Sequence, residues 1–481
     1  MKQLIPQSIK NIYHLFQAVL ANFWCGFPSK ELKVIGVTGT NGKTTTVQMI
    51  VKVLEEAGFR VAAVSTINFK LGGKEWVNDT KFTTLSSFKL QKFLREAVKA
   101  GCEYAILEVS SHSLDQNRTW GVDFVVAVIT NVTREHLDYH KTMEEYRKAK
   151  ERLFERVSKN KEGVSVVNLE MEKPEEFLKH KTKEKYGYLL ETQSVKLKAQ
   201  NHSAKLKTVI AREMEFNVSH TKYKIRNTNF FLNLPGRFNV ENALAATCVG
   251  LSQNISLEKI SQALGEIKGM PGRLEGIENN RGIKIIVDYA VTPDSLEKLY
   301  KLIEEMARRS DRAAGGESGR TASVIAVFGA CGERDRGKRP IMGEVVARYA
   351  DYCIVTNEDP YNEDPMRIIN EVFAGIVGEN PNVKISMSKQ IPNPKSQIQS
   401  DIPNTKYKIP DTKVEGENCW RILDRRDAIK KALRLAKPGD IVVVTGKGVE
   451  ETMAVGNKRI PWNDPKVIRE VLLELEKEKS R

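Results

Sequence analysis

Residues 36–45 (GVTGTNGKTT) combine the residue types that bind a nucleotide phosphate. Gly39 and Gly42 allow backbone N–H groups to approach a phosphate closely. Lys43 would reach the β- and γ-phosphates, and the hydroxyl of Thr44 would bind Mg²⁺. The alternative is a glycine-rich turn with a solvated lysine. Because the segment lies between an expected strand and an expected helix, we favour a phosphate loop.

A glutamate and two histidines follow later strands. Glu108 lies in the apolar run 104–109, and a carboxylate at a strand end beside a phosphate loop can hold Mg²⁺. An ordinary loop acid explains Glu108 equally well. His136 and His140 lie in residues 130–140, where their spacing matches a zinc pair only weakly. A structural histidine is the alternative for both.

A lysine occupies the apolar face of the helix expected from Met143 to Phe154. Lys150 shares that face with Tyr146 and Leu153 through spacings of three and four residues. An unpaired buried ammonium is costly, so the side chain would usually extend past its neighbours to solvent. The functional alternative is a lysine held among metal ions or phosphates, or one converted chemically to an acid.

The elements that must position these residues alternate between strands and helices. Strand-like runs lie at residues 31–37, 61–65, 104–109, 124–130 and 164–168, and a helix is expected over 43–57. This alternation predicts an α/β fold with a P-loop-type central domain on a mostly parallel sheet. The Lys-rich residues 180–230 favour a peripheral β-meander.

A second α/β run begins near Gly272 and predicts a Rossmann-like C-terminal domain. Its expected strands are residues 283–288, 323–328, 352–356 and 441–445, and its helices start at Ser295, Pro340, Pro365, Arg426 and Pro465. Residues 309–321 and 388–414 are polar and lack periodicity, so we expect surface insertions there.

The composition narrows the class of protein. With 481 residues, 41% of them hydrophobic, the chain can bury substantial cores and is not a disordered protein. Its net charge of +15 allows nucleic acid, an anionic membrane or a phosphate-bearing small molecule as a partner. Six scattered cysteines indicate a reducing compartment rather than a disulfide framework. The segment 13–27, which has no formal charge, is too short to span a bilayer and predicts an apolar or a surface-seeking helix packed on the next domain.

Several segments occur in the order seen in a known family. They are GVTGTNGKTTT, EVSSHSL, TNVTREHLDYHKTMEEYRKAKERLF, LPGRFNVENALAA, MPGRLE, VDYAVTPDSLEKL, VFGACGERDRGKRPIMG and GKGVE. The chain resembles the Mur ligases, most closely the MurE type, from Leu32 to Glu450. An ordered set of motifs is far more specific than any single one.

The resemblance implies an ATP-dependent amide ligase of peptidoglycan precursor synthesis. In this family ATP phosphorylates a substrate carboxylate, an amine attacks the acyl phosphate, and ADP and phosphate leave. The implied cofactors are ATP and Mg²⁺, and the substrates a UDP-muramoyl peptide and an amino acid, without nucleic acid or a membrane span. The implied parts are a short N-terminal helical segment (1–30, a remnant of the UDP-binding domain), a central ATP-binding domain (31–270) and a C-terminal domain (271–481). We expect a cytoplasmic monomer.

The resemblance also assigns roles by position. The implied catalytic residues are Lys43, Lys150, His136 and Arg273. The implied nucleotide contacts are Gly39, Thr40, Asn41, Gly42, Lys43, Thr44, Thr45, Asn239, Asn242, Arg273, Asp288 and Lys338, with Arg339 beside them. The implied substrate contacts are Thr83, Thr84, Ser110, Arg118, Glu358, Asp359, Tyr361, Gly446 and Glu450. The implied metal ligands are Thr44, Glu108, His136 and Lys150. Lys150 matches the family's carbamylated lysine, which would explain its place on an apolar face.

Three departures from the family pattern concern substrate and metal. The segment before Gly36 is shorter than a UDP-binding domain, so the uridine end is held differently, a partner protein supplies that domain, or the substrate differs. Residues 358–361 read Glu-Asp-Pro-Tyr instead of the Asp-Asn-Pro-Arg of diaminopimelate-adding enzymes. Losing that arginine removes a carboxylate clamp, and nearby acids favour a cationic side chain such as lysine or ornithine. Val291 replaces a histidine and Glu135 an aspartate, which would alter a nucleotide contact or the metal site.

Other functions stay open at this point. One is a related ligase acting on another carboxylate, as folylpolyglutamate or cyanophycin enzymes do. Another is a nucleic-acid-binding P-loop ATPase, but the Lys-rich residues 179–207 lack interleaved aromatics for base stacking and fit a solvated face better. A degenerate, substrate-binding relative is the third. Retention of Lys43, Glu108, His136 and Lys150 argues against it.

Overall fold

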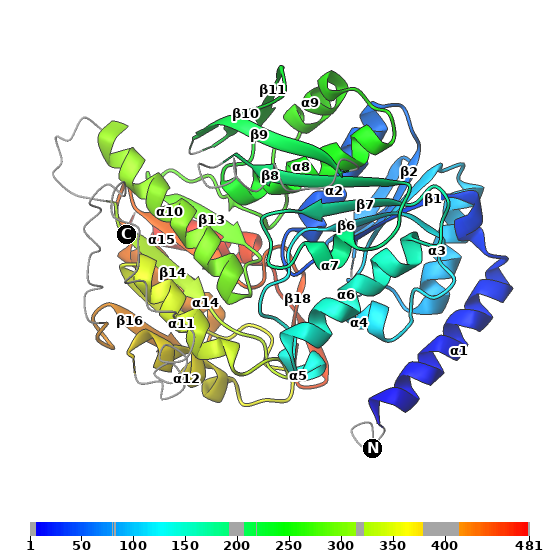
Figure 1. Cartoon of the computed structure of the whole chain (residues 1–481). Helices are drawn as coiled ribbons and strands as arrows, with labels where there is room; N and C mark the ends of the chain where they lie inside the picture. Colours follow the sequence, from blue (N-terminus) through cyan, green and yellow to red (C-terminus); the bar gives the residue numbers. More distant parts are fainter. Residues whose placement is uncertain are drawn as a thin grey trace, which may run out of the picture. The chain divides into compact units, whose positions relative to one another are not determined.

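The computed structural model describes residues 6–78, 80, 83–191, 206–217, 219–313, 322–378 and 413–479. The chain divides into two compact units, unit 1 over Met1–Gly269 and unit 2 over Met270–Arg481. Figure 1 shows that each unit contains a sheet with helices packed on it.

Unit 1 is built on a large, mostly parallel sheet. Its strands are β1 (Lys33–Thr38), β2 (Val61–Val64), β3 (Asn68–Leu71), β4 (Lys74–Val77), β5 (Tyr104–Glu108), β6 (Phe124–Ile129), β7 (Val164–Asn168), β8 (Glu184–Leu190), β9 (Leu206–Phe216), β10 (Thr221–Ile225) and β11 (Thr228–Leu232). Within the described residues they follow the order β11-β10-β9-β8-β7-β6-β1-β5-β2-β3-β4. The pairs from β9 to β2 are parallel, and the strands beyond them at both ends pair antiparallel.

The central strands are buried on both faces, which explains their continuous apolar runs. Every residue of β5 is buried, and β1 is buried after its first residue. In the pairing, Val37 of β1 lies opposite Glu108 of β5, and Thr38 lies opposite Ile129 of β6. The carboxyl ends of three neighbouring strands therefore meet at one edge, where the loops that follow them converge.

Helices cover this sheet and complete unit 1. They are α1 (Gln7–Cys25), the 3₁₀ helix η2 (Pro28–Glu31), α2 (Lys43–Glu56), α3 (Ser87–Lys99), α4 (Ser111–Asp115), α5 (Leu137–His140), α6 (Met143–Val157), α7 (Glu175–Leu178), α8 (Arg237–Ser252) and α9 (Leu257–Gly265). α2 packs against α8 and α9, α6 packs against α4 and β6, and α1 packs against α3. The phosphate loop and the helix that carries Lys150 thus belong to one packed unit.

Unit 2 contains a second, smaller sheet. Its strands are β12 (Glu275–Gly276), β13 (Lys284–Asp288), β14 (Val324–Phe328), β15 (Tyr352–Thr356), β16 (Cys419–Ile422) and β17 (Ile441–Thr445), with β18 (Thr452–Val455) and β19 (Lys458–Pro461) as a separate hairpin. In the described part of the unit, the order is β12-β13-β17-β14-β15-β16, parallel except for β12. Its helices are α10 (Pro293–Ala313), α11 (Lys338–Tyr349), α12 (Pro365–Ile376), α14 (Arg425–Leu435) and α15 (Asp464–Lys479).

The expected α/β fold with two sheets is confirmed, with differences in detail. The meander expected over residues 180–230 is only partly present, because β8 is largely buried and extends the parallel sheet. The insertion expected at 309–321 begins later, since residues 309–313 belong to α10, and the rest lies outside the described residues. Of the segment 388–414, only residues 413–414 are described. The N-terminal helix is confirmed as α1, and no described helix is long and apolar enough to cross a bilayer.

Candidate active site

The phosphate loop between β1 and α2 has glycine where no side chain fits. Gly39 has a φ of +150°, and a Cβ there would lie 1.8 Å from the Thr130 hydroxyl oxygen. Gly42 has a φ of +83°, and a Cβ there would lie 2.3 Å from Asn242 Oδ1. Because α2 begins at Lys43, its first N–H groups face this loop. The loop is therefore compact and has backbone donors available for a phosphate.

The segment after β6 holds the loop from the other side. Asn131 Oδ1 accepts a hydrogen bond from the Asn41 N–H at 2.9 Å, and Asn131 Nδ2 donates to the Asn41 carbonyl at 3.1 Å. Thr130 Oγ1 donates to the same carbonyl at 2.6 Å, and the Thr40 N–H donates to the Asn131 carbonyl at 2.9 Å. Neither Thr130 nor Asn131 is among the sequence-predicted site residues. The available signal was their position directly after a buried strand.

Glu108, at the end of β5, binds the start of α2. Its Oε2 accepts hydrogen bonds from Thr44 Oγ1 at 3.0 Å and from the Thr66 N–H at 2.7 Å, and its Oε1 accepts from Thr66 Oγ1 at 2.9 Å. Glu108 is 1% exposed and is the last residue of β5, so it is not a solvated side chain of the following loop, and its metal role stays a prediction. Oxygen ligands from a hydroxyl and a carboxylate are those that Mg²⁺ prefers, so the Thr44–Glu108 pair fits this ion.

Lys150 lies beneath the phosphate loop. Its side chain is 1% exposed, which excludes an ammonium that extends to solvent. Its Nζ donates to the Gly39 carbonyl at 2.7 Å. Burial lowers the pKa of Lys150 well below its usual value, and nearby Lys43 lowers it further, while Glu135 opposes the shift. Lys43 itself donates from Nζ to the Thr40 carbonyl at 2.9 Å.

Tyr146 connects Lys150 to the loop and to the histidines. The Lys150 Nζ lies 4.3 Å from the centroid of the Tyr146 ring. The hydroxyl groups of Tyr146 and Thr40 are hydrogen-bonded at 3.1 Å. The centroid of the His136 ring lies 6.1 Å from that of Tyr146. Tyr146 is missing from the sequence-predicted site, although its position four residues before Lys150 on the same helix face was a usable signal.

The placement of His136 leaves its metal role a prediction. His136 has a φ of +58°, a partly exposed side chain, and a ring centroid 4.7 Å from that of His112. Its Nδ1 lies 4.0 Å from Glu135 Oε1. In the part of the chain that is described, no group of three or more His, Cys, Asp or Glu side chains is placed to hold a metal ion. The metal role of Lys150 likewise stays a prediction.

The predicted acceptor contacts form one group next to Glu108. Thr84 Oγ1 donates to the Glu108 carbonyl at 3.1 Å and accepts from the Ser110 N–H at 3.0 Å. Arg118 donates to the Thr84 carbonyl at 3.1 Å. Thr83 Oγ1 accepts from Thr66 Oγ1 at 3.2 Å. These side chains lie within one hydrogen-bonded region, and their role as substrate contacts stays a prediction.

Two asparagines near the start of α8 have different contacts, and only one of them is bonded to the helix that follows the phosphate loop. Asn242 Oδ1 accepts from Thr46 Oγ1 at 3.3 Å, so this residue contacts the first turn of α2, which also holds the buried Thr45. Asn239 instead donates from Nδ2 to the Pro235 carbonyl at 2.8 Å. A nucleotide contact from Asn239 stays a prediction.

The nucleotide contacts predicted in unit 2 lie around the ends of β13 and α11. The Arg273 guanidinium lies 5.0 Å from the Tyr289 ring centroid, and Asp288 accepts from the Leu274 N–H at 2.8 Å. Burial raises the pKa of Asp288, and Arg273 opposes that shift. Lys338 is buried and donates to the Val291 carbonyl at 3.0 Å.

Arg339, expected beside the nucleotide, has another environment. Its guanidinium is fully buried and pairs with Glu363 at 2.9 Å and Glu371 at 2.7 Å. These contacts join α11 to α12 and to the loop before it. The geometry thus supports a structural role for Arg339.

Glu358 is a buried acid with one unsatisfied oxygen. Its Oε1 accepts from Cys331 Sγ at 3.1 Å, whereas its Oε2 has no hydrogen-bond partner in the described structure. Burial raises the pKa of Glu358. A Cβ at Gly446, where φ is +111°, would lie 2.6 Å from that Oε2. The absence of a side chain at Gly446 therefore allows the carboxylate to approach the backbone closely.

The other predicted acids of unit 2 already have a cation. Lys447 is fully buried, and its Nζ lies 2.8 Å from Asp359 Oδ1 and pairs with Glu450. Burial would lower the pKa of Lys447, but the carboxylates of Glu450 and Asp359 outweigh it and raise that pKa. Tyr361 has a φ of +52° and lies near the Arg334 guanidinium. Among these acids, Glu358 is therefore the one with carboxylate capacity left for a ligand.

Two family models and several relatives match this chain. The Mur ligase middle domain matches residues 37–250, and the Mur ligase glutamate ligase domain matches residues 272–448. A UDP-N-acetylmuramyl-tripeptide synthetase of Roseiflexus sp. (strain RS-1) is 34% identical over 474 residues, with 95% of this chain and 82% of that protein covered. A UDP-N-acetylmuramoyl-L-alanyl-D-glutamate–2,6-diaminopimelate ligase of Clostridium botulinum is 36% identical over 463 residues. The match covers 95% of this chain and 81% of that protein.

Solved structures are similar to this chain in fold. A UDP-N-acetylmuramoyl-L-alanyl-D-glutamate–2,6-diaminopimelate ligase has a TM-score of 0.53 at 28% identity and covers 92% of this chain and 79% of that chain. A folylpolyglutamate synthase of Mycobacterium tuberculosis complexed with ADP has a TM-score of 0.62 at 14% identity. The match covers 90% of this chain and 91% of that chain. The second likeness concerns the fold alone.

Proposed function

The chain belongs to the Mur ligase family and is an ATP-dependent ligase of the MurE type, and from that premise we propose its reaction and site. The protein joins an amino acid to a UDP-N-acetylmuramoyl peptide through an acyl phosphate. The observation that carries this proposal is the buried Lys150 Nζ at 2.7 Å from the carbonyl of the phosphate-loop residue Gly39. A buried amine beside a phosphate loop is costly unless the site uses it.

The residues of unit 1 would hold the phosphates and the acceptor. The loop N–H groups and Lys43 bind the transferred phosphoryl group, so charge is neutralised while the acceptor carboxylate is held in line. Arg118, Ser110 and Thr84 orient the acceptor peptide. Mg²⁺, when bound at Thr44 and Glu108, supplies electrostatic stabilisation of the phosphoryl oxygens. His136 is the further ligand that we propose.

Lys150 would act as a carbamate. In its neutral form the Nζ attacks the carbon of CO₂: an N–C bond forms, one C=O π bond opens to give the anionic oxygen, and one proton leaves the nitrogen to solvent. The lowered pKa of Lys150 favours the neutral amine that this step needs. The product is an anionic oxygen ligand next to Tyr146 and the phosphate loop, which removes the cost of an unpaired buried cation.

On the amino-acid side, Glu358 would select the substrate. Its Oε2, which has no hydrogen-bond partner, lies beside Gly446, and a cationic group there would neutralise the negative charge of the buried carboxylate. Lysine and ornithine carry such a group without a second carboxylate. Relatives of this chain are named diaminopimelate ligases, so diaminopimelate belongs in the same comparison.

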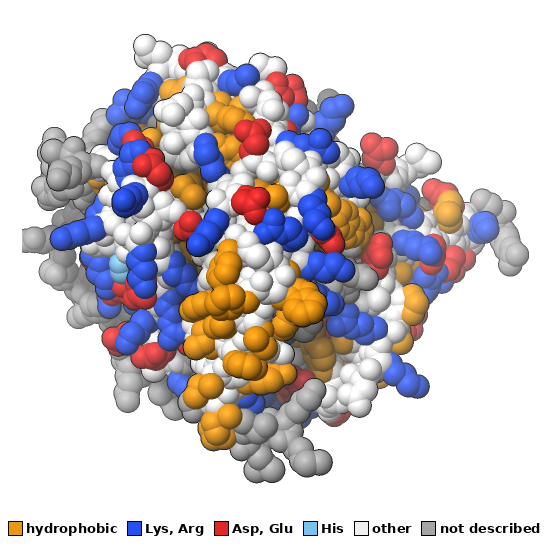
Figure 2. Space-filling view, turned by 90° about the vertical axis from the view of Figure 1, so that its right-hand side faces the viewer, with side chains coloured by type: hydrophobic (Ala, Val, Ile, Leu, Met, Phe, Trp, Pro, Cys, Tyr) orange, Lys and Arg blue, Asp and Glu red, His pale blue; other side chains and the backbone are white. Residues whose placement is uncertain are grey.

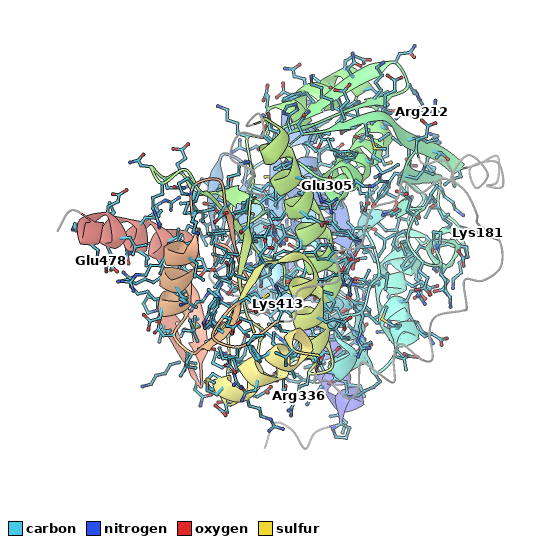
Figure 3. The ribbon with its side chains drawn as sticks, turned by 90° about the vertical axis from the view of Figure 1, so that its left-hand side faces the viewer. Lys181, Arg212, Glu305, Arg336, Lys413 and Glu478 are labelled. Carbon is cyan, nitrogen blue, oxygen red and sulfur yellow. The ribbon has the colours of Figure 1, made fainter. Side chains whose placement is uncertain are left out.

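The basic surface does not favour a nucleic-acid ATPase. Lys181 and Arg212 lie at the surface of unit 1 (Figure 3). Neighbouring cations in this stretch are paired with acids, Lys207 with Glu184 and Lys179 with Glu151. Such pairs reduce the field that a polyanion would meet.

We also propose that the protein is a monomer, because one chain carries the predicted phosphate-binding residues and the predicted amino-acid contacts. Since the reaction uses ATP, we propose that it acts in the cytoplasm.

The test is phosphate release from ATP with UDP-muramoyl peptides and a panel of lysine, ornithine and diaminopimelate. We expect turnover only when acceptor, amino acid and Mg²⁺ are all present. Turnover with a folate acceptor instead would establish the related-ligase alternative. DNA-stimulated ATP turnover without dependence on an amino acid would refute the proposal.

A further inference from the structure

Helix α1 exposes an apolar stripe to solvent. Seven side chains, each between 44% and 87% exposed, make up the stripe, and we call them the α1 stripe: Ile9, Ile12, Tyr13, Phe16, Leu20, Phe23 and Trp24. Their spacing of three and four residues places them on one face of the 19-residue helix. Figure 2, which views the side of the molecule where α1 lies, shows a continuous hydrophobic patch on this face. A helix at the surface normally turns its polar side chains to water and its apolar side chains to the core.

The opposite face of α1 is fixed to unit 1 by small and polar residues. Asn22, fully buried, donates from Nδ2 to the Ala18 carbonyl and to the Trp120 carbonyl, each at 2.8 Å. Asn11 donates to Asp115 at 3.3 Å. Ala18 and Ala21 are also buried. The helix is thus held with its polar contacts inward, so rotation that would bury the α1 stripe would break these hydrogen bonds.

The surroundings of the stripe are basic. α1 contains no Asp or Glu, and its neighbour α3 carries Lys89, Lys92, Arg95 and Lys99 against a single acid, Glu96. Lys30 of η2 and Lys10 of α1 add two more cations. Glu31 of η2 pairs with Arg95 at 2.7 Å, and Asp115, which contacts Asn11, pairs with Arg152 at 2.9 Å, so the remaining cations outnumber the acids. Figure 2 shows Lys and Arg side chains around the hydrophobic patch. An apolar, aromatic face with a positive border complements an anionic, amphiphilic surface.

We propose that the α1 stripe is a docking surface for an anionic lipid bilayer, with α1 lying in the plane of the interface. A helix of this length would extend about 28 Å along the membrane rather than cross it. Tyr13 and Trp24 have the amphipathic rings that settle at the headgroup level, and Phe16 and Leu20 would enter the acyl boundary. A second copy fits this face less well, because a symmetric pair would bring two basic borders together. The proposal is independent of the reaction.

The test is co-sedimentation of the full chain with vesicles of phosphatidylcholine containing phosphatidylglycerol, compared with phosphatidylcholine alone. We expect binding to the anionic vesicles that weakens in high salt. Because Trp24 is 87% exposed, its fluorescence should shift to shorter wavelength on binding, and Trp24→Phe should remove that shift. The double variant Phe16→Ser/Leu20→Ser should bind at least about tenfold more weakly, since it removes two apolar anchors.

Leu473→Ser is the matched control, because Leu473 is 58% exposed on α15, away from α1 in the sequence, and should leave binding unchanged. Equal binding by the Phe16→Ser/Leu20→Ser variant would overturn the proposal. So would failure of the wild-type chain to sediment with anionic vesicles. A wild-type dimer by light scattering that this double variant converts to a monomer, without vesicle binding, would assign the stripe to a second copy instead.

Discussion

The side-chain nitrogen of Lys150 and the carbonyl oxygen of Gly39, a residue of the phosphate loop, lie 2.7 Å apart. The two residues come from elements that are 111 positions apart in the chain. Any change in the charge of Lys150 therefore acts directly on the phosphate loop. This contact links the state of one side chain to the geometry of the nucleotide site.

Replacing Lys150 by alanine should reduce ligase turnover by at least about a hundredfold, because the site loses an anionic ligand. Addition of formate or acetate should restore part of the activity by standing in for the carbamate. Lys148→Ala is the control, since Lys148 is exposed on the same helix. Full activity of the Lys150→Ala variant would refute the carbamate.

Tyr146→Phe should lower turnover about tenfold and the free energy of unfolding by about 1 kcal/mol. The hydroxyl removed is bonded to Thr40 in the phosphate loop at 3.1 Å, whereas the ring beside Lys150 is retained. Steady-state kinetics with varied ATP and chemical denaturation measure the two effects. If the Tyr146→Phe variant has a lower free energy of unfolding but unchanged turnover, Tyr146 has a structural role only.

Gly42→Ala should weaken binding of a non-hydrolysable ATP analogue by at least about tenfold, because its Cβ would overlap Asn242 Oδ1. Gly58→Ala is the matched control. Gly58 has a similar positive φ of +93°, but a Cβ there meets no atom within 4 Å. The control should lose about 1 kcal/mol of stability and keep its affinity. Calorimetry gives the affinity, and thermal unfolding gives the stability.

Acidification should destabilise unit 1 through His140. Burial lowers the pKa of His140 from 6.5 to about 4, and Lys150 adds to the shift. Between these values the unfolded chain binds more protons than the folded one, so stability is present above pH 6.5 and falls as pH decreases toward 4. With solvent screening allowed for, the loss should be about 2 kcal/mol. Denaturation of His140→Gln at several pH values should show a shallower fall, while His220→Gln should match the wild type.

Glu358→Gln should raise the KM for the amino acid at least about tenfold and leave the KM for ATP unchanged. The variant keeps the shape of the side chain and removes the charge offered to a cationic substrate. Glu417→Gln, at an exposed position of the same unit, is the control. If the amino-acid KM is unaffected, Glu358 does not bind the substrate cation.

The sequence was sufficient to predict those parts of the fold that depend on apolar runs and glycine turns. The strands around Glu108 and the start of α2 at Lys43 are where their patterns place them. The burial of Lys150 was not decided by the sequence, because a lysine on an apolar face can extend to solvent or stay inside. Thr66, Thr130 and Asn131 were missed, since short polar residues after strands are common. Their role depends on which strands are neighbours, and the sheet order gives this information. The ion pairs of Arg339 were missed because they depend on the packing of α11 against α12.

The contact between the start of α2 and α8 has a consequence for how the chain is synthesised. Thr46 and Asn242 are hydrogen-bonded although 196 residues separate them. The loop leaves the ribosome early, but its partner on α8 follows only after nearly all of unit 1 has been translated. A nascent chain that ends before α8 should therefore fail to bind nucleotide, so ATP affinity would report completion of the unit during translation.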